Sequence, residues 1–79
     1  MLLLFHKEEC PYCHKVRQFL SDNNVSFVSV VSKSGAPSRK ILTALAGKDQ
    51  VPFLIDTDRG EMMLESDAII GYVKKHYVD

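Results

Sequence analysis

The chain has 79 residues, 46% of them hydrophobic, and its ten lysines and arginines balance ten aspartates and glutamates. The zero net charge argues against nucleic acid or an anionic membrane surface as the main partner. No apolar run approaches the roughly 20 residues that span a bilayer. The length predicts one small domain, residues 1–79. The opening MLLLF lacks the flanks of a signal peptide, so we interpret it as a buried strand and expect a cytoplasmic protein.

The first half of the chain predicts a strand, a helix and a second strand. Residues 2–6, LLLFH, are apolar almost throughout, which favours a strand buried on both faces. Pro11 suits the first position of a helix. Apolar residues then recur at helical spacing until SDNN ends the helix near Ser21. Residues 25–31, VSFVSVV, are rich in β-branched side chains and predict the second strand.

The second half predicts a helix, two strands and a final helix. Ser38 is expected to cap a helix that stops at Gly47. VPFLID at residues 51–56 and GEMMLE at residues 60–65 predict two strands. The short TDRG between them favours a hairpin and antiparallel pairing. Ser66 is expected to cap the last helix.

The resulting order of elements is β-α-β-α-β-β-α. A β-α-β opening requires a right-handed crossover and places the first two strands parallel. The predicted fold class is therefore α/β, with a four-stranded mixed sheet flanked by three helices.

Both cysteines, Cys10 and Cys13, lie in the stretch HKEECPYCHK. A zinc site usually needs four ligands. His6 and His14 would have to complete it, although His14 directly follows Cys13 on a helix and points about 100° away. A structural disulfide would close a loop too short to stabilise the fold much, and a cytoplasmic thiol pool would reduce it. A redox pair is the favoured interpretation, and no metal is expected.

Cys10 is predicted to lie where a strand ends and a helix begins. Free N–H groups and the positive end of the helix dipole stabilise a thiolate there, so we expect a lowered pKa for Cys10. Lys7 adds a positive charge, whereas Glu8 and Glu9 oppose it, and the balance depends on geometry. Because Cys13 lies one turn further on, we expect Cys10 to be the exposed attacking thiol and Cys13 the shielded resolving thiol.

The CPYC motif resembles that of the glutaredoxin family, within the thioredoxin fold. QVPFL is similar to the family's TVP segment, which implies a cis peptide bond before Pro52. ESDAII is similar to the segment that binds the γ-glutamyl end of glutathione, and Lys7 stands where glutaredoxins commonly carry a basic residue. These motifs span nearly the whole chain in the family's order. The resemblance therefore implies a thioredoxin-like fold and a glutathione site.

Within that resemblance, Cys10 and Cys13 are the implied catalytic pair. The backbone of Val51, freed by a cis Pro52, would pair with the cysteinyl part of glutathione. Alternatively, Pro52 merely starts a strand.

The remaining implied glutathione contacts come from Ser66, Asp67, Lys7, Tyr12 and Gln50. The first two would bind the α-carboxylate and α-ammonium of the ligand, or simply cap the helix. Lys7 would pair with the glycyl carboxylate, or remain an ordinary solvated lysine. Tyr12 would shape the groove, or be a surface aromatic. Gln50 stands where the family often has threonine, so its contact is a weaker expectation.

One departure from glutaredoxins is that EMMLESD replaces the usual double glycine before the final helix. Its acidic–serine pair resembles the N-terminal domain of glutathione transferases, whose additional helical domain we do not expect in these 79 residues.

The leading hypothesis is a monomeric glutathione-dependent thiol–disulfide oxidoreductase. Glutathione would be its co-substrate, and glutathionylated or disulfide-containing proteins its partners. One alternative is a transferase-like glutathione-binding domain. The other is an iron–sulfur cluster carrier that uses Cys10 and glutathione from two subunits, which Pro11 disfavours by stiffening the site.

Overall fold

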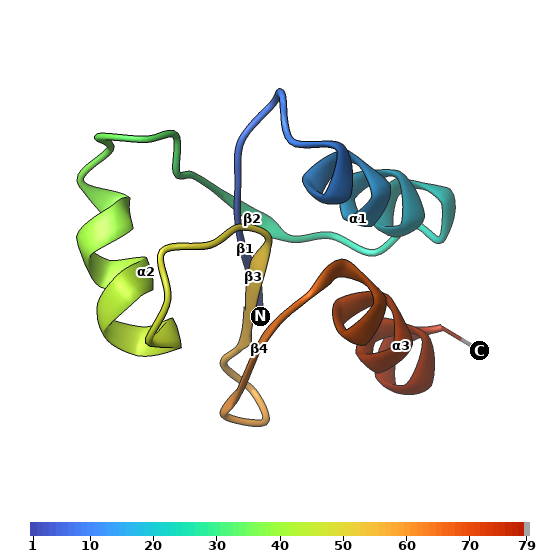
Figure 1. Cartoon of the computed structure of the whole chain (residues 1–79). Coiled ribbons are helices and arrows are strands. Elements are labelled where there is room, and N and C mark those ends of the chain that lie inside the picture. Colours follow the sequence, from blue (N-terminus) through green and yellow to red (C-terminus); the bar gives the residue numbers. More distant parts are fainter. Residues whose placement is uncertain (79) are drawn as a thin grey trace.

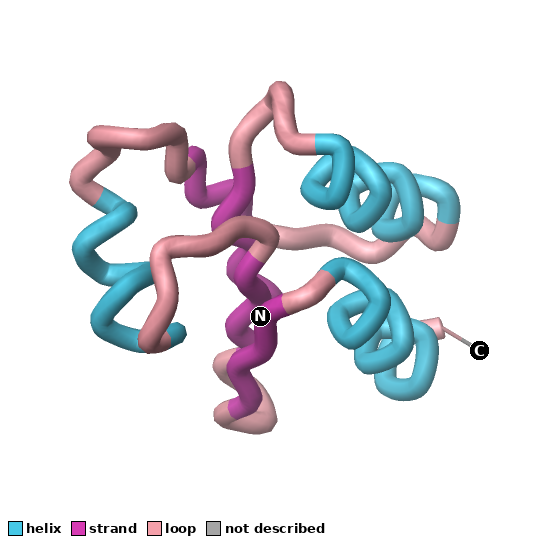
Figure 2. The backbone as a smooth tube through the Cα atoms, in the orientation of Figure 1, coloured by secondary structure: helices cyan, strands magenta, loops and turns pink. Residues whose placement is uncertain are grey.

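The computed structural model describes residues 1–78 and has the predicted α/β architecture (Figures 1 and 2). Its elements are β1 (Leu2–His6), α1 (Pro11–Asp22), β2 (Val28–Val31), α2 (Ser38–Ala46), β3 (Phe53–Asp56), β4 (Glu61–Leu64) and α3 (Ser66–Tyr77). The predicted order β-α-β-α-β-β-α and the thioredoxin-like fold class are therefore confirmed. Within residues 1–78, no helix combines the length and the apolar character that crossing a membrane requires.

The sheet is mixed, with the strand order β2-β1-β3-β4. β1 runs parallel to β2 and antiparallel to β3, and β4 pairs antiparallel with β3. Both predicted pairings, the parallel opening and the hairpin, are confirmed. Figure 1 shows α2 on one face of the sheet, with α1 and α3 together on the other.

Alternate side chains of β1 point to opposite faces of the sheet, and both faces are covered. Leu4 and its cross-strand partner Leu54 are fully buried on the side of α1 and α3. Phe5 packs on the other side with Phe53, their ring centroids 5.4 Å apart, and with Leu42 of α2. The nearly unbroken apolar run of β1 follows from this double burial.

The two predicted serine caps were wrong. Ser38 and Ser66 are the first residues of their helices, which follow Pro37 and Glu65, and neither preceding residue makes a side-chain cap. The Ser38 hydroxyl instead donates to the carbonyl of Val31 at 2.8 Å. A hydroxyl near a helix start is free to bond elsewhere, and only the tertiary contact decides which acceptor it finds.

The second and third strands are shorter than predicted. β2 begins at Val28, whereas Val25 and Phe27 pack against the core without pairing with β1. β-Branched composition does not distinguish a strand from an extended connection whose side chains are partly buried. β3 begins at Phe53, directly after Pro52, whose nitrogen has no hydrogen to donate to a ladder.

Candidate thiol site and adjoining cavities

Cys10 lies at the N-cap of α1, on the loop that leaves β1. Its backbone is extended, with φ −84° and ψ 116°, and Pro11 occupies the first helical position. The backbone N–H of Cys13 donates to the Cys10 Sγ over 3.3 Å. The structure therefore places the Cys10 sulfur where a helix offers hydrogen-bond donors to an anion.

Both cysteines are free thiols, and both are largely covered. Cys13 is fully buried, which confirms its expected shielding, but Cys10 exposes only 8% of its surface. The prediction of an openly exposed Cys10 was wrong, because the loop turns tightly and the Cys10 N–H approaches the Lys7 carbonyl at 3.4 Å. A cavity of about 420 Å³, lined in part by Lys7, Glu9 and Pro11, still reaches Cys10.

The surroundings of Cys13 keep it protonated. Burial raises the pKa of Cys13 to about 12, and its hydrogen bond with Cys10 adds to this; the Lys7 backbone and the charge of Arg17 act in the opposite direction. Cys13 is therefore a neutral thiol near pH 7. Because thiolates and not thiols are the nucleophiles, Cys13 is disfavoured as the sulfur that reacts first.

Each acidic residue before Cys10 has a cation of its own. The Glu9 Oε2 lies 3.2 Å from the Lys33 Nζ, and the Glu8 Oε1 lies 3.7 Å from the Arg17 Nη2. The hydrogen bond from Lys33 lowers the pKa of Glu9, so this carboxylate is ionised and paired. The negative charges of Glu8 and Glu9, which would oppose a thiolate at Cys10, are therefore each offset by a neighbouring cation.

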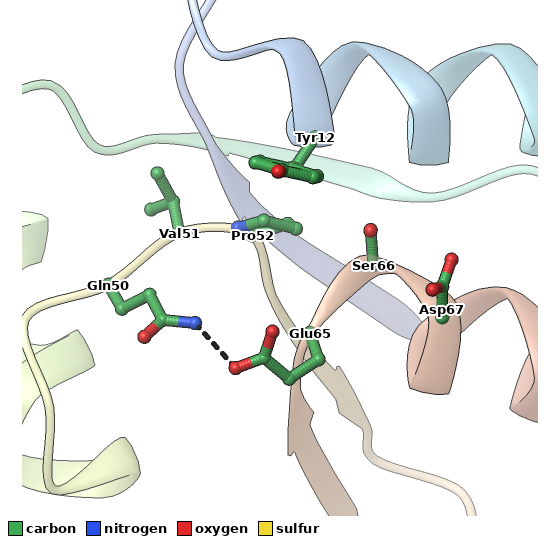
Figure 3. A pocket seen from close by; sticks show the side chains of 7 residues that line it. All are labelled: Tyr12, Gln50, Val51, Pro52, Glu65, Ser66 and Asp67. Atoms are coloured by element: carbon green, nitrogen blue, oxygen red, sulfur yellow. Dashed lines mark hydrogen bonds between the residues drawn. The ribbon is translucent and has the colours of Figure 1, made fainter.

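A second cavity, of about 410 Å³, lies between α1, the loop before β3 and the start of α3 (Figure 3). We refer to it as the α3 cavity. It gathers six of the residues that the sequence singled out as ligand contacts, and these are Tyr12, Gln50, Val51, Pro52, Ser66 and Asp67. In Figure 3 the Tyr12 ring stands opposite Pro52, across the mouth from the first turn of α3. The fold thus brings together three segments that are far apart in the sequence.

Val51 joins the two cavities, because it lines both of them. The Val51–Pro52 peptide bond is cis, which confirms the geometry implied by the resemblance. The β3 ladder begins only at Phe53, so Val51 precedes the paired part of the strand. Lys7, the remaining predicted ligand contact, does not line the cavity at the start of α3; it lines the cavity that reaches Cys10, together with Val51.

The first turn of α3 combines a buried hydroxyl with an exposed carboxylate. Ser66 is buried, while the Asp67 Oδ1 accepts a hydrogen bond from the Lys15 Nζ of α1 at 2.7 Å. The start of a helix suits an anion because its N–H groups are unpaired, and the Asp67 carboxylate suits a cation. This turn can therefore bind a group that carries both charges, such as the free end of an α-amino acid.

Glu65 is the lining residue that was not among the predicted contacts. It accepts a hydrogen bond from the Gln50 Nε2 at 3.1 Å, drawn as the dashed line in Figure 3. Its φ of 75° lies in the left-handed region, which is costly for a residue other than glycine. The signal was present in EMMLESD, where an acidic residue stands close to the position of a glutaredoxin glycine.

His6, one of the two histidines that a zinc site would need, has both ring nitrogens engaged by other side chains. His6 Nε2 contacts Ser29 Oγ, and its Nδ1 accepts from Arg17. Among residues 1–78, no group of three or more His, Cys, Asp or Glu side chains is arranged to hold a metal ion.

A family model described as the N-terminal domain of glutathione S-transferase matches residues 4–79. The chain belongs to this family. The match agrees with the acidic–serine pair at Glu65 and Ser66, which resembles that domain.

Individual relatives include both glutaredoxins and transferases. Glutaredoxin 3 of Escherichia coli (strain K12) is 35% identical over 49 residues, which cover 62% of this chain and 59% of that protein. A diazinon-metabolizing glutathione S-transferase of Bombyx mori superposes with a TM-score of 0.85 at 26% identity, over 98% of this chain and 38% of that one. Glutaredoxin 2 of Salmonella typhimurium, solved in complex with glutathione, superposes with a TM-score of 0.81 at 26% identity. The superposition covers 94% of this chain and 33% of that one.

The resemblance to glutaredoxins and to the transferase N-terminal domain is therefore confirmed. This chain spans less than two thirds of the length of each of these three relatives.

Proposed function

We propose that this member of the family is a glutathione-dependent thiol–disulfide oxidoreductase that reduces glutathione mixed disulfides and protein disulfides. The observation that carries the proposal is the junction at Val51, where the cavity that reaches Cys10 adjoins the cavity at the start of α3. Glutathione bound across this junction would have its sulfur near Cys10. We further propose that residues 1–79 act as one monomeric domain in the cytoplasm, where glutathione keeps thiols reduced.

We propose a chemically matched neighbour for each part of glutathione. We expect the α-carboxylate to lie at the N–H groups of α3 beside Ser66, and the α-ammonium to take the place of Lys15 at Asp67. The backbone of Val51 would pair with the cysteinyl residue as a short strand. Lys7 would meet the glycyl carboxylate beside Cys10.

The proposed reaction is a series of thiol–disulfide exchanges. The Cys10 thiolate attacks the glutathione sulfur of a mixed disulfide, so that a Cys10–glutathione bond forms and the substrate leaves as a thiolate. A second glutathione thiolate then attacks this bond, which releases glutathione disulfide and restores the Cys10 thiolate. In the dithiol route Cys13 attacks Cys10 instead, glutathione leaves as a thiolate, and a Cys10–Cys13 disulfide remains.

The test of the function is a pair of assays on the same sample. With reduced glutathione present, the protein should turn over the mixed disulfide of glutathione and a small thiol, measured as glutathione disulfide formed. The same sample should not accelerate the conjugation of glutathione to a chlorodinitrobenzene. Failure to reduce the mixed disulfide would sink the proposal.

The second candidate is a transferase-like role, which the family match and the pair Glu65 and Ser66 favour. In that role glutathione binds in the α3 cavity and its thiolate attacks an electrophile, while Cys10 makes no disulfide. Conjugation of the electrophile without reduction of the mixed disulfide would support this candidate over the first.

Replacing Glu65 by glycine is expected to separate stability from ligand binding. Relief of the left-handed backbone is worth about 1–3 kcal/mol, and glycine costs roughly 0.5–1 kcal/mol in chain entropy. Glu65→Gly should therefore unfold at higher urea concentration, with a gain of about 1 kcal/mol. Loss of the carboxylate should weaken glutathione binding by about tenfold, measured by calorimetry.

Glu65→Gln is the matched control for this prediction. It keeps the backbone conformation and the side-chain volume but loses the charge, so its stability should match the wild type while its affinity falls. A Glu65→Gly protein that binds glutathione as tightly as the wild type would show that Glu65 takes no part in the site.

A further inference from the structure

Arg17 is a largely covered cation beneath the loop that leads to Cys10. Its side chain exposes only 17%. Its Nη1 donates to the Nδ1 of His6 and to the carbonyl of Lys7, each at 3.2 Å. Its Nη2 approaches the Glu8 carbonyl at 3.5 Å and the Glu8 carboxylate at 3.7 Å. One guanidinium therefore ties together three consecutive residues just before Cys10.

This arrangement depends on a neutral His6. Burial lowers the pKa of His6, the charge of Arg17 lowers it further, and Glu8 acts in the opposite direction. The Nδ1 must be unprotonated to accept from Arg17, which assigns the ring hydrogen to Nε2 and points it at the Ser29 Oγ. Covering a guanidinium in this way is costly unless its hydrogen-bonding groups are matched, and here the partners are the last residue of β1 and the two residues that follow it toward Cys10.

Arg17 also lies one helical turn after the second cysteine on α1. Residues four apart on a helix lie one above the other, so Arg17 follows Cys13 on the same face of α1. The charge of Arg17 and the Lys7 backbone are the two influences that oppose the strong protonation of Cys13. Cys13 needs such help only when it must itself become a nucleophile.

We propose that Arg17 is a positioning residue for the second thiol exchange, in which Cys13 attacks a mixed disulfide on Cys10. The inference rests on the proposed redox role of the two cysteines. In this step Cys13 loses its proton to water and its thiolate attacks the Cys10 Sγ. A Cys10–Cys13 bond forms, and the group bound to Cys10 leaves as a thiolate. Arg17 stabilises the attacking thiolate and holds residues 6–8 in place beside it, whereas the first attack by Cys10 does not need it.

A single stopped-flow experiment separates the two steps without glutathione. The reduced protein is mixed with an aromatic nitrobenzoate disulfide, whose thiolate is coloured. The first coloured thiolate reports the attack by Cys10, at a rate that depends on reagent concentration. The second coloured thiolate reports the attack by Cys13, at a rate that is independent of reagent concentration. This second phase should be missing in Cys13→Ser.

Arg17→Met is expected to slow the second phase at least about tenfold and the first phase less than about threefold. Because the thiolate fraction of Cys13 falls, the pH profile of the second phase should move up by about one pH unit. Arg17→Lys, which keeps the charge but not the planar fork, should recover part of the rate. Lys75→Met, which removes an exposed positive charge of α3 from outside both cavities, should leave both phases unchanged.

Several charged and titratable groups around Cys13 contribute to the pH profile of the second phase. They are Cys10 from the loop, Arg17 from the same helix, His6 and Glu8 beyond Arg17, and the paired Lys15 and Asp67 at the contact of α1 with α3.

Equal slowing of both phases, no slowing, or a lower second rate without a shifted pH profile would each overturn the proposal in favour of a purely structural arginine. If Arg17→Met does not fold, as judged by urea unfolding, Arg17→Lys and Arg17→Gln carry the same comparison. The reagent contains no glutathione, so the result for Arg17 stands apart from whether the wild type reduces glutathione mixed disulfides.

Discussion

Replacing Cys10 by serine is expected to lower the turnover of a glutathione mixed disulfide at least about 1000-fold, to the uncatalysed rate. A serine hydroxyl is barely ionised at pH 7 and cannot form the mixed disulfide. Cys13 cannot take over, because it is fully buried and its pKa is raised to about 12. The measurement is the initial rate of glutathione disulfide formation with the wild-type and Cys10→Ser proteins.

Cys13→Ser is the matched control, since it removes the other sulfur from the same motif. We expect it to keep at least about a third of the activity on the glutathione mixed disulfide, where a second glutathione can resolve the intermediate. It should lose most of its activity on a substrate with an intramolecular protein disulfide, which requires both sulfurs. Substantial activity in Cys10→Ser, or complete loss in Cys13→Ser on the mixed disulfide, would contradict the assigned roles.

Replacing Asp56 by asparagine is expected to lower the free energy of unfolding at pH 7 by about 3–5 kcal/mol, a large part of what a small domain has. Asp56 is fully buried at the end of β3. It accepts hydrogen bonds from the hydroxyls of Tyr72 at 2.6 Å and Tyr77 at 2.8 Å, from Arg59 at 3.3 Å and from the N–H of Asp58 at 3.0 Å. An amide cannot accept all four and turns a donor toward them.

The exposed neighbour Asp58 provides the control. Its carboxylate pairs with the terminal amino group at the surface, where ion pairs contribute about 0–1 kcal/mol. Asp58→Asn should therefore shift the urea midpoint only slightly. A loss for Asp56→Asn no larger than that for Asp58→Asn would show that the buried carboxylate does not hold α3 to the sheet.

Asp56 also predicts how stability depends on pH. Burial alone would raise the pKa of Asp56, but the hydrogen bonds from Tyr72, Tyr77, the Asp58 N–H and Arg59 outweigh it and hold the pKa well below the ordinary 3.8. The same contact works in reverse on the phenol, because burial and the bond to Asp56 raise the pKa of Tyr72 to about 12.

Because the folded-state pKa of Asp56 is depressed, its contribution is complete above the unfolded-state pKa and is lost as the pH falls toward the folded one. The free energy of unfolding of the wild type should therefore decline below about pH 5, with up to about 1.4 kcal/mol per pH unit from this group. Urea titrations at several acidic pH values should show a shallower decline for Asp56→Asn. Equal slopes in the two proteins would contradict the assignment.

The order of elements could be predicted because each one leaves a local pattern. LLLFH is buried on both faces as its composition indicated, and TDRG joins two antiparallel strands as a short turn should. The ends of elements were harder to predict, since Ser38 bonds to Val31 and the side chains of Val25 and Phe27 are partly buried outside any strand. Where these elements end depends on contacts with residues that are distant in the sequence, which a short stretch of sequence does not show.

Some features of the candidate site could likewise be predicted from the sequence, and others could not. The position of Cys10 at a helix start follows from CPYC itself, because proline begins the helix and the next cysteine falls one turn later. The exposure of Cys10 does not follow, since the turn toward Lys7 covers it. Glu65 was noted in the sequence only as part of the acidic–serine pair and not as a ligand contact, because its left-handed backbone and its bond to Gln50 are visible only in three dimensions.

By itself, the sequence determined the α/β order, the position of Cys10 at a helix start and the segments that line the α3 cavity, because these depend on neighbours in the chain. Only the tertiary structure decided which charges meet. It pairs Glu8 with Arg17 and Glu9 with Lys33, and it closes two tyrosines of α3 over Asp56. Ion pairs and buried hydrogen bonds depend on distances of a few ångströms between residues remote in sequence, and no local pattern encodes them.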